Sequence, residues 1–254
     1  MRLTYIATCA RMTGRELRRR SLVLGLALLV PVVFFAVVAA TTGNGVIPLQ
    51  LAAASNDATI LAGERRQSLL FISIASAGII SAFFASSLIQ QQVNSNRRLV
   101  LCGYRASELI TARLVVLLGI VMATGVYTSL LLTLIESPRF PAGVSLGIVL
   151  AAFVHGCYGL LVGVIFRREL ESIFATIVLI NIDAGWLQNP AYYANAHSKW
   201  LIEALPAHYP AQASYIAAFT SEGIGRLAAF SLAYGAALLA TAVVIYAVRM
   251  RVAR

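Results

Sequence analysis

Charged residues are scarce in this sequence. Asp, Glu, Lys and Arg make up 12% of the 254 residues, whereas they make up about 25% of a typical soluble domain. Hydrophobic residues make up 59%, and the mean hydropathy is +0.82. This composition argues against a soluble fold, and no polar block is large enough to form a second folded domain. We predict one membrane domain over residues 1–254.

Motifs for ATP chemistry and for metal binding are also missing, and we expect no serine in a Gly-x-Ser-x-Gly elbow. Lys199 is the sole lysine, so the chain has no Gly-x-x-x-x-Gly-Lys-[Ser/Thr] loop for ATP phosphates. The histidines are not paired at the spacing of metal ligands. Cys9, Cys102 and Cys157 are isolated and odd in number, which favours free thiols over a disulfide framework or a zinc site. We expect no catalytic residue, metal or cofactor in this chain.

Six apolar runs are candidates for membrane-spanning helices, because a span needs about 20 mostly apolar residues. They are Ser21–Ala40, Ser68–Ile89, Leu114–Ile135, Gly143–Ile165, Ser172–Trp186 and Leu227–Val248. The fifth would be only about 22 Å long, which is short for a bilayer unless the helix continues into the polar segment after it. We predict an all-α integral membrane protein with six transmembrane helices.

Basic residues predict the orientation of these spans, because cytoplasmic segments hold an excess of arginine and lysine. Most of the 20 lie in one alternating set of segments: Arg2, Arg11, Arg15, Arg18, Arg19, Arg20, Arg97, Arg98, Arg105, Arg113, Arg167, Arg168, Arg249, Arg251 and Arg254. The other set holds Arg65, Arg66, Arg139, Lys199 and Arg226. We expect a multi-pass protein of the cell membrane with both termini cytoplasmic. Topology and anionic lipid headgroups account for the net charge of +10, so no nucleic-acid partner is expected.

The segment 1–20 before the first span has an amphipathic pattern. In a helix, Leu3, Ile6, Ala10 and Leu17 would share one side, and Thr4, Thr8, Arg11, Arg15 and Arg18 the other. We predict an amphipathic helix that lies in the headgroup plane, with a frayed basic tail as the alternative. The first apolar run could instead belong to a signal peptide, but it is about twice the usual 7–15 residues. We expect it to be retained.

A basic segment over residues 90–113 joins the second and third spans. Gly103 divides it into two short helical patterns, and Ser107 and Glu108 suit the start of the second, because a hydroxyl and an acid favour a helix N-terminus. Leu99 and Leu101 accompany the arginines, a mixture that suits docking on another protein. The alternative is a plain connecting loop.

The order of these elements resembles the permease (transmembrane) subunits of ATP-binding cassette (ABC) exporters of the type-2 membrane family. The likeness rests on an amphipathic N-terminal helix, a first span, an external loop, a second span and a basic, glycine-broken loop that ends in Arg113. In that family this loop is the coupling helix, which sits in a groove of a separate ATPase subunit. The resemblance assigns ATPase contact to Arg97, Arg98, Leu101, Tyr104, Arg105 and Glu108.

Residues 187–226, between the fifth and sixth spans, are too polar to cross a bilayer and too apolar for a free loop. Irregular backbone at membrane depth must be buried in protein or line a wet cavity, so we predict an external re-entrant or interfacial helical segment. Its aromatic residues would lie at headgroup level: Tyr192, Tyr193, Trp200 and Tyr209. The short fifth span ending after Gly185, then Pro190, then an apolar stretch closing at Leu205-Pro206, resembles the external re-entrant helices of the same exporters.

Polar residues inside the spans are the candidates for function. Asp183 is the only carboxylate in a predicted span, with Asn181 two residues before it. Acids in a bilayer are costly and often functional, although Asp183 is also near enough to the end of its span to reach interfacial water. His155, in the fourth span, is either a packing residue or a proton carrier. Gly159 and Gly163 permit close helix contact.

One side of the second span is mildly polar and aromatic. Ser73, Ser76, Phe84, Ser87 and Gln91 fall within a sector of about 120°. Together with Asn181 and Asp183, we predict that they line a path for an amphiphilic substrate. The alternative is that the serines pack the spans together.

The resemblance implies a non-enzymatic transport subunit. It would pair with itself or with a similar permease, as a homodimer or heterodimer in membrane lipid, and would bind separate ABC ATPase subunits that hold ATP and magnesium. Its cargo would be an amphiphile such as a drug, lipid or peptide antibiotic. Two alternatives stay open: a proton-coupled secondary transporter that uses Asp183 and His155, and a non-transporting membrane scaffold subunit. Against the former, many secondary transporters have paired broken helices, whereas here only the fifth span looks broken.

Overall fold

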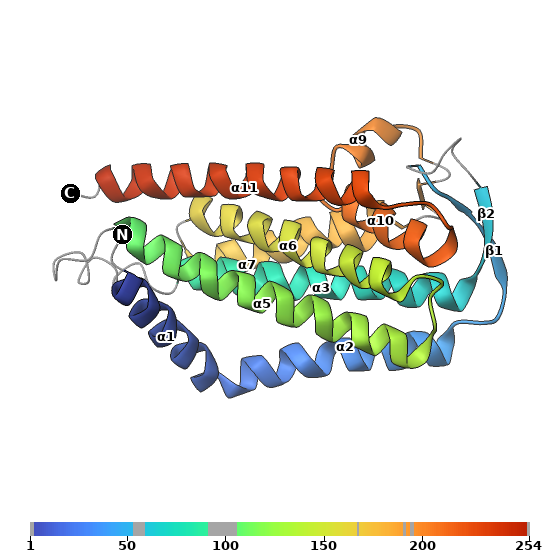
Figure 1. Ribbon diagram of the computed structural model, residues 1–254, viewed down its shortest axis with the longest axis horizontal. Coiled ribbons are helices and arrows are strands. Elements are labelled where there is room, and N and C mark those ends of the chain that lie inside the picture. Colours follow the sequence, from blue (N-terminus) through green and yellow to red (C-terminus); the bar gives the residue numbers. More distant parts are fainter. Residues whose placement is uncertain are drawn as a thin grey trace.

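The computed structural model describes residues 3–52, 59–90, 106–166, 168–189, 192–193 and 196–252. Long helices run side by side, with both chain termini at one end and a β-hairpin at the other (Figure 1). We call these the terminal end and the hairpin end of the bundle.

Within the described residues, six helices are long and apolar enough to cross a membrane, as the sequence predicts. They are α2 (Ser21–Thr41), α3 (Glu64–Gln90), α5 (Ala106–Ile135), α6 (Pro141–Ile165), α7 (Glu169–Ile182) with the π-helical turn η1 (Asp183–Leu187), and α11 (Gly225–Val252). With η1, the fifth span covers 19 residues, or about 28 Å, which approaches the thickness of a bilayer core. The fold is consistent with an all-α multi-pass membrane protein.

The helices α3 and α6 form the centre of the bundle, and glycines bring them into close contact. A Cβ added to Gly159 would lie 2.6 Å from the Cα of Ala82, and one added to Gly163 would lie 3.0 Å from the Cα of Ser86. The expected close contact at both glycines is therefore confirmed. Around this pair, α3 also packs against α2, α5 and α7, and α6 against α5, α7 and α11.

Side chains from two other helices bind the last carbonyl groups of α6, which lack partners within their own helix. The side-chain amide of Gln90, at the end of α3, donates to the carbonyls of Gly163 and Phe166 at 2.6 Å each. The guanidinium of Arg249 in α11 donates to the carbonyls of Val164 and Ile165. Three spans are thus joined at the terminal end.

The external loop predicted between the first two spans contains a β-hairpin that the sequence analysis did not predict. Strand β1 (Val46–Gln50) pairs antiparallel with β2 (Thr59–Gly63), with Val46 opposite Gly63. Leu49 and Ala62 are buried, so the hairpin packs one side onto the bundle. The fold is therefore helical throughout the spans but not over the whole chain.

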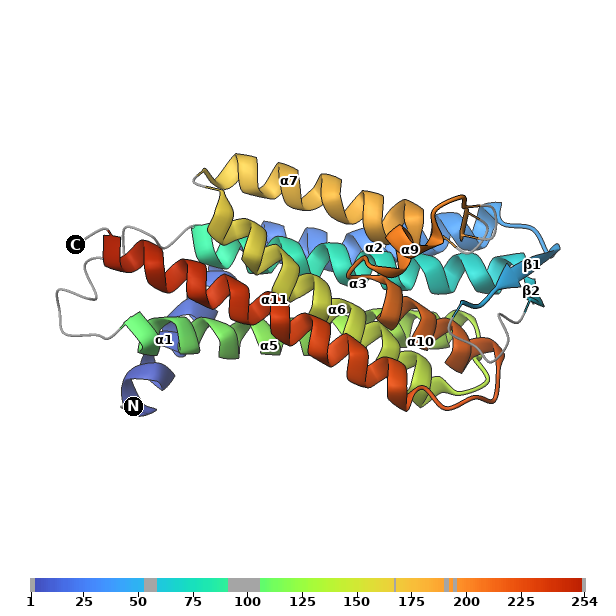
Figure 2. The same ribbon diagram turned by 90° about the horizontal axis from the view of Figure 1, so that it is seen from above.

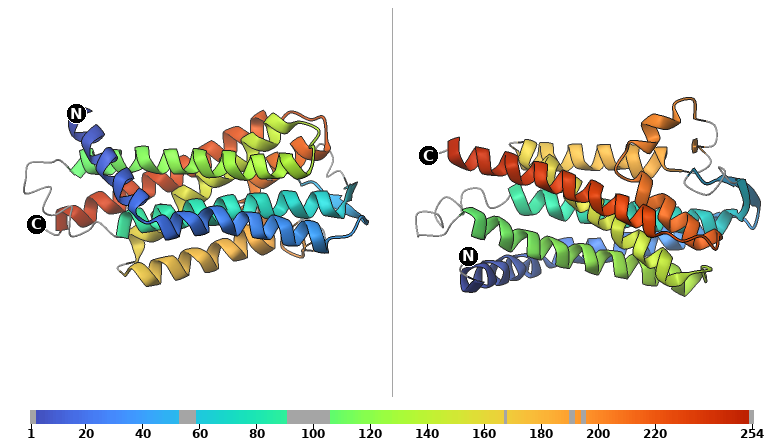
Figure 3. Two further views of the ribbon diagram at one scale, coloured as in Figure 1. Left: turned by 90° about the horizontal axis from the view of Figure 1, so that it is seen from below. Right: turned by 45° about the horizontal axis from the view of Figure 1, so that its top comes forward.

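The N-terminal segment forms helix α1 (Leu3–Arg19), which turns away from the direction of α2 (Figure 3). Cys9 packs with Leu109 and Ala112 of α5, and Ile6 and Ala10 join this cluster. Part of the predicted apolar side of α1 therefore contacts protein. Cys9 and Cys157 are free and buried, in agreement with the expected thiols.

Between the fifth and sixth spans the chain forms α9 (Lys199–Glu203) and α10 (His208–Phe219). The residues of α10 are almost all buried, because this helix packs against α6 and α11 at the hairpin end (Figure 2). Of the predicted aromatic anchors, Tyr192 and Trp200 are exposed. Tyr193 is instead buried, and its hydroxyl donates to the Glu203 carboxylate at 2.7 Å.

Candidate functional site

The fifth span loses α-helical geometry at Asp183. The α-helix α7 ends at Ile182, and residues Asp183–Leu187 form one turn of π-helix before the chain leaves the bundle. Single π-helical turns inside or beside α-helices occur frequently at functional sites. Here the turn directs the Asp183 side chain inward, where it is only 4% exposed.

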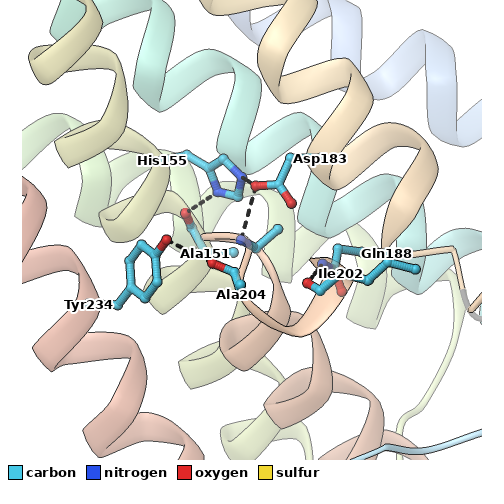
Figure 4. A network of polar contacts seen from close by, with 8 residues as sticks. Ala151, His155, Asp183, Gln188, Ile202, Ala204 and Tyr234 are labelled. Atoms are coloured by element: carbon cyan, nitrogen blue, oxygen red, sulfur yellow. Dashed lines mark hydrogen bonds and ion pairs between the residues drawn. The ribbon is translucent and has the colours of Figure 1, made fainter. Parts of the chain in front are cut away.

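The imidazole of His155 lies opposite Asp183 in the interior (Figure 4). His155 comes from the middle of α6 and is 0% exposed. Gly78 of α3 packs against its ring, since a Cβ added there would lie 3.0 Å from Cγ and Nδ1 of His155. The position of the imidazole therefore depends on a glycine in a third helix.

The hydrogen bonds around this pair indicate which nitrogen of His155 carries the ring hydrogen. Nδ1 of His155 lies 2.8 Å from the carbonyl oxygen of Ala151, so we assign the ring hydrogen to Nδ1. Nε2 lies 3.7 Å from Oδ2 of Asp183, beyond the usual hydrogen-bond range, and has no hydrogen-bond partner among the described residues. A neutral imidazole and an ionised carboxylate would point two acceptors at each other. One added proton, on either group, relieves that conflict.

Asp183 also holds the start of the segment after η1. Its Oδ2 accepts a hydrogen bond from the backbone N–H of Ala207 at 3.0 Å, in the turn before α10. Its Oδ1 is buried and has no hydrogen-bond partner among the described residues. One carboxylate thus contacts both α6 and the chain leading into α10, and it keeps a free acceptor.

Two further hydrogen bonds hold the same turn (Figure 4). The hydroxyl of Tyr234 in α11 donates to the carbonyl of Ala204 at 2.9 Å, and the side chain of Gln188 donates to the carbonyl of Ile202 at 3.0 Å. No sequence pattern indicates these partners, because each contact joins segments that are distant along the chain. We call His155, Asp183, Gln188 and Tyr234 with their backbone partners the polar network.

The residues predicted for a substrate path do not come together. Asn181 is exposed, and its side chain donates to the carbonyl of Ile177 on its own helix. Asp183 is buried, because two residues advance a helix by about 200° and so point to opposite sides. Ser73 and Ser76 donate to the carbonyls of Leu69 and Ile72. Ser73, Ser76, Phe84 and Ser87 are all buried inside this chain.

Two members of that polar stripe do reach a cavity. Phe84 and Ser87 line a space of about 190 Å³ at the terminal end, between α1, α2, α3 and the start of α7. This cavity was not predicted. Gln91 lies outside the described residues, as do Arg97, Arg98, Leu101, Tyr104 and Arg105 of the predicted ATPase contact.

Glu108 is the one described residue of that predicted contact. It lies in the first turn of α5 and is only 2% exposed. An acid there favours the start of a helix, as expected, because the helix N-terminus is electrically positive. In this conformation its carboxylate faces the protein interior.

The sequence does contain one pattern found in hydrolases, although we expected no Gly-x-Ser-x-Gly elbow. Gly143–Gly147 matches Gly-x-Ser-x-Gly around Ser145, which in hydrolases stands on a sharp strand-to-helix turn. Here the pattern lies in the first turns of α6, and the Ser145 hydroxyl is hydrogen-bonded to that of Ser129 in α5. The match therefore lacks the strand-to-helix turn of a nucleophile elbow.

A comparison with models of known protein families found no match to this chain, and a search of curated proteins found no similar sequence.

Proposed function

We propose that this chain is the transmembrane subunit of an ABC exporter of the type-2 membrane family. The order of its elements supports the proposal most directly: α1, a first span, a second and third span joined by a basic segment, and two short helices, α9 and α10, between the fifth and sixth spans. In the proposal α1 lies in the headgroup plane, and residues 187–226 form the external re-entrant segment. The protein lies in the cell membrane, and both of its termini are cytoplasmic.

The permease pairs with a second copy or a similar chain and binds two separate ATPase subunits. Those subunits hold ATP and magnesium, since this chain has no phosphate-binding loop. Arg97, Arg98, Leu101, Tyr104 and Arg105 form the ATPase contact, and Glu108, which is buried here, joins it only in another conformation. The cargo is an amphiphile such as a drug, lipid or peptide antibiotic.

The packing of α3 supports a route for mechanical coupling. The basic segment begins where α3 ends, at Gln90, and α3 packs against α2, α5, α6 and α7. When ATP draws the ATPase subunits together, a displacement of the basic segment would move α3, and its neighbours would have to repack because protein interiors are dense. The polar stripe of α3 would then be exposed to cargo only in another conformation.

The test is a comparison of two triple variants. Replacing Arg97, Arg98 and Arg105 by alanine should leave insertion intact while co-purification with the ATPase, or its stimulation by cargo, falls sharply, because charges at the rim of an interface mainly govern association. The matched control replaces Arg66, Arg139 and Arg226. That control loses an exposed ion pair of Arg66 with Glu136, worth at most about 1 kcal/mol. An intact complex in the first variant and a lost one in the control would refute the assignment.

The polar network favours a second candidate, a proton-coupled secondary transporter, because two ionisable side chains, His155 and Asp183, face each other across 3.7 Å in the interior. The two functions differ in energy source. Transport by an exporter should stop when the ATPase is inactivated and should survive Asp183→Asn in folded protein. Transport by a carrier should survive loss of the ATPase, collapse with a proton uncoupler and be abolished by Asp183→Asn. A chain that transports nothing under either condition would be a scaffold subunit.

A further inference from the structure

The cavity at the terminal end has a lining that the proposed function does not use. It lies in the angle between α1 and α2, against the last turns of α3 and the first turn of α7. Its volume of about 190 Å³ is large enough for several non-hydrogen atoms, since one water occupies about 30 Å³ in the liquid. We call it the elbow cavity.

Charges of both signs line the elbow cavity. Glu16 and Arg20 form an ion pair across 3.6 Å on one wall, and Glu169 at the start of α7 supplies a second carboxylate. Two acids and one guanidinium suit a ligand that carries a positive group beside a negative one. A simple anion would meet two like charges, and a simple cation would leave the guanidinium facing no negative group of the ligand.

The other walls are mostly apolar. They are formed by Leu17, Val23, Phe83, Phe84 and Leu88, with Thr13 and Ser87 as the uncharged polar members of the lining. Outside the cavity, the apolar surface continues along α2 and α7, which flank α3 on either side (Figure 3). Leu22 is 74% exposed and Leu170 is 82% exposed. A ligand with a zwitterionic head and hydrocarbon chains would therefore match this site: the head would meet the charged wall, and the chains would lie along the apolar surface.

The depth of the elbow cavity matches that of a lipid headgroup. Arg20 immediately precedes the first span, Glu169 begins the fifth, and Leu88 lies two residues before the end of α3. Three spans thus reach the membrane surface at this level, where the polar headgroup region borders a hydrocarbon core about 30 Å thick.

We propose that the elbow cavity binds the headgroup of an ethanolamine phospholipid. The ammonium group lies between Glu16 and Glu169, and the phosphate binds Arg20. A primary ammonium donates three hydrogen bonds to carboxylates, whereas the quaternary ammonium of choline donates none. An anionic glycerol headgroup has no cation for the two acids. The proposal depends on membrane insertion alone and stands apart from any ATPase.

The experiment is native mass spectrometry of the full-length purified chain, loaded with equimolar phosphatidylethanolamine, phosphatidylcholine and phosphatidylglycerol. The parent should retain phosphatidylethanolamine preferentially. Glu169→Gln and Glu16→Gln should each weaken its retention about tenfold, because a charge-assisted hydrogen bond contributes about 1.5–3 kcal/mol. Arg20→Gln should weaken both zwitterionic lipids without changing the preference between them.

Two variants control for nonspecific effects. Glu171→Gln makes the same charge change two residues along α7, where the side chain is 50% exposed and paired with Arg168, and it should behave as the parent. Val23→Phe keeps all three charges, fills the elbow cavity and should lose phosphatidylethanolamine. Lipid retention is compared only between the parent and variants whose thermal midpoints are equal to that of the parent. Equal retention of phosphatidylcholine, preferred phosphatidylglycerol, a bound amphiphile that is not a phospholipid, or an equal loss in Glu171→Gln would overturn the proposal.

Discussion

Nε2 of His155 faces Oδ2 of Asp183 across 3.7 Å in the interior, although the two residues belong to the fourth and fifth spans. The same oxygen accepts the N–H of Ala207, so a single carboxylate contacts α6 and the turn before α10. Removing its charge should affect both contacts at once.

Asp183→Asn should therefore destabilise the protein. The amide oxygen is a weaker acceptor for the N–H of Ala207 than the carboxylate is, and loss of this buried hydrogen bond costs about 1–3 kcal/mol. Unfolding in mixed micelles, followed by circular dichroism, gives the free energy of unfolding. Asn181→Ala is the control, because Asn181 is exposed and bonds only its own helix; it should change stability by about 0.5 kcal/mol or less. If His155→Gln and Asp183→Asn prove strictly additive, the two residues do not interact.

Gly78→Ala should also be destabilising, because the added Cβ would lie 3.0 Å from the His155 ring in a packed interior. Overpacking of this kind costs about 1–3 kcal/mol. Gly119→Ala is the matched change, since no described atom outside its own helix backbone lies within 4 Å of a Cβ there. That variant should be neutral or more stable by up to about 1 kcal/mol, as alanine favours helix. Equal effects of the two variants on the thermal midpoint would contradict the role of Gly78.

Arg249→Ala should loosen the terminal end, because the carbonyls of Val164 and Ile165 lose their donor. Faster hydrogen exchange at the end of α6, measured by mass spectrometry, is the expected result. Arg249→Lys should restore only part of the protection, since an ammonium lacks the fork that reaches two carbonyls. Arg168→Ala is the control, because Arg168 pairs with the exposed Glu171 and should leave this exchange unchanged.

Topology can be tested with single cysteines in a background lacking the native ones. Cysteines at Gly43, Arg139 and Ser198 should react with an impermeant thiol reagent added outside cells, and one at Arg15 should not. Native Cys9 is a poor inside probe, because burial raises the pKa of its thiol and leaves little reactive thiolate. Reaction at Arg15 with protection at Ser198 would reverse the orientation deduced from the basic residues.

The six spans could be predicted because length and hydropathy are local properties. The structure moves most of their ends by four residues or fewer, but α5 begins at Ala106, eight residues before the predicted start. The β-hairpin was missed since Pro48, which has no N–H, stands in the middle of β1 and argues against a strand. Its partner Leu61 still pairs with it in the register. A two-stranded ribbon tolerates proline because each strand has an open edge.

The candidate site was predictable only in part. Asp183 and His155 stood out as ionisable residues in apolar runs, but no sequence pattern shows that they face each other. The serines of α3 do form a visible sequence pattern, but the pattern is ambiguous. A polar stripe fits both a substrate path and a contact with another helix. Ser86 illustrates the second outcome, because its hydroxyl bonds that of Ser172 in α7 at 2.7 Å.

The first span is nearly uncovered: of the residues in α2, only Pro31 and Phe35 are buried within the chain. Most of its other side chains face outward, although Val23 lines the elbow cavity and Val38 and Ala39 pack against the core. Where lipid surrounds the outward-facing side chains, selection should act on their hydrophobicity alone. Leucine, valine, isoleucine and phenylalanine should therefore replace one another freely in homologous sequences. Outward-facing positions of α2 that resist such exchange would mark where another polypeptide covers the helix. A saturation mutagenesis library scored by growth or export would map that footprint directly.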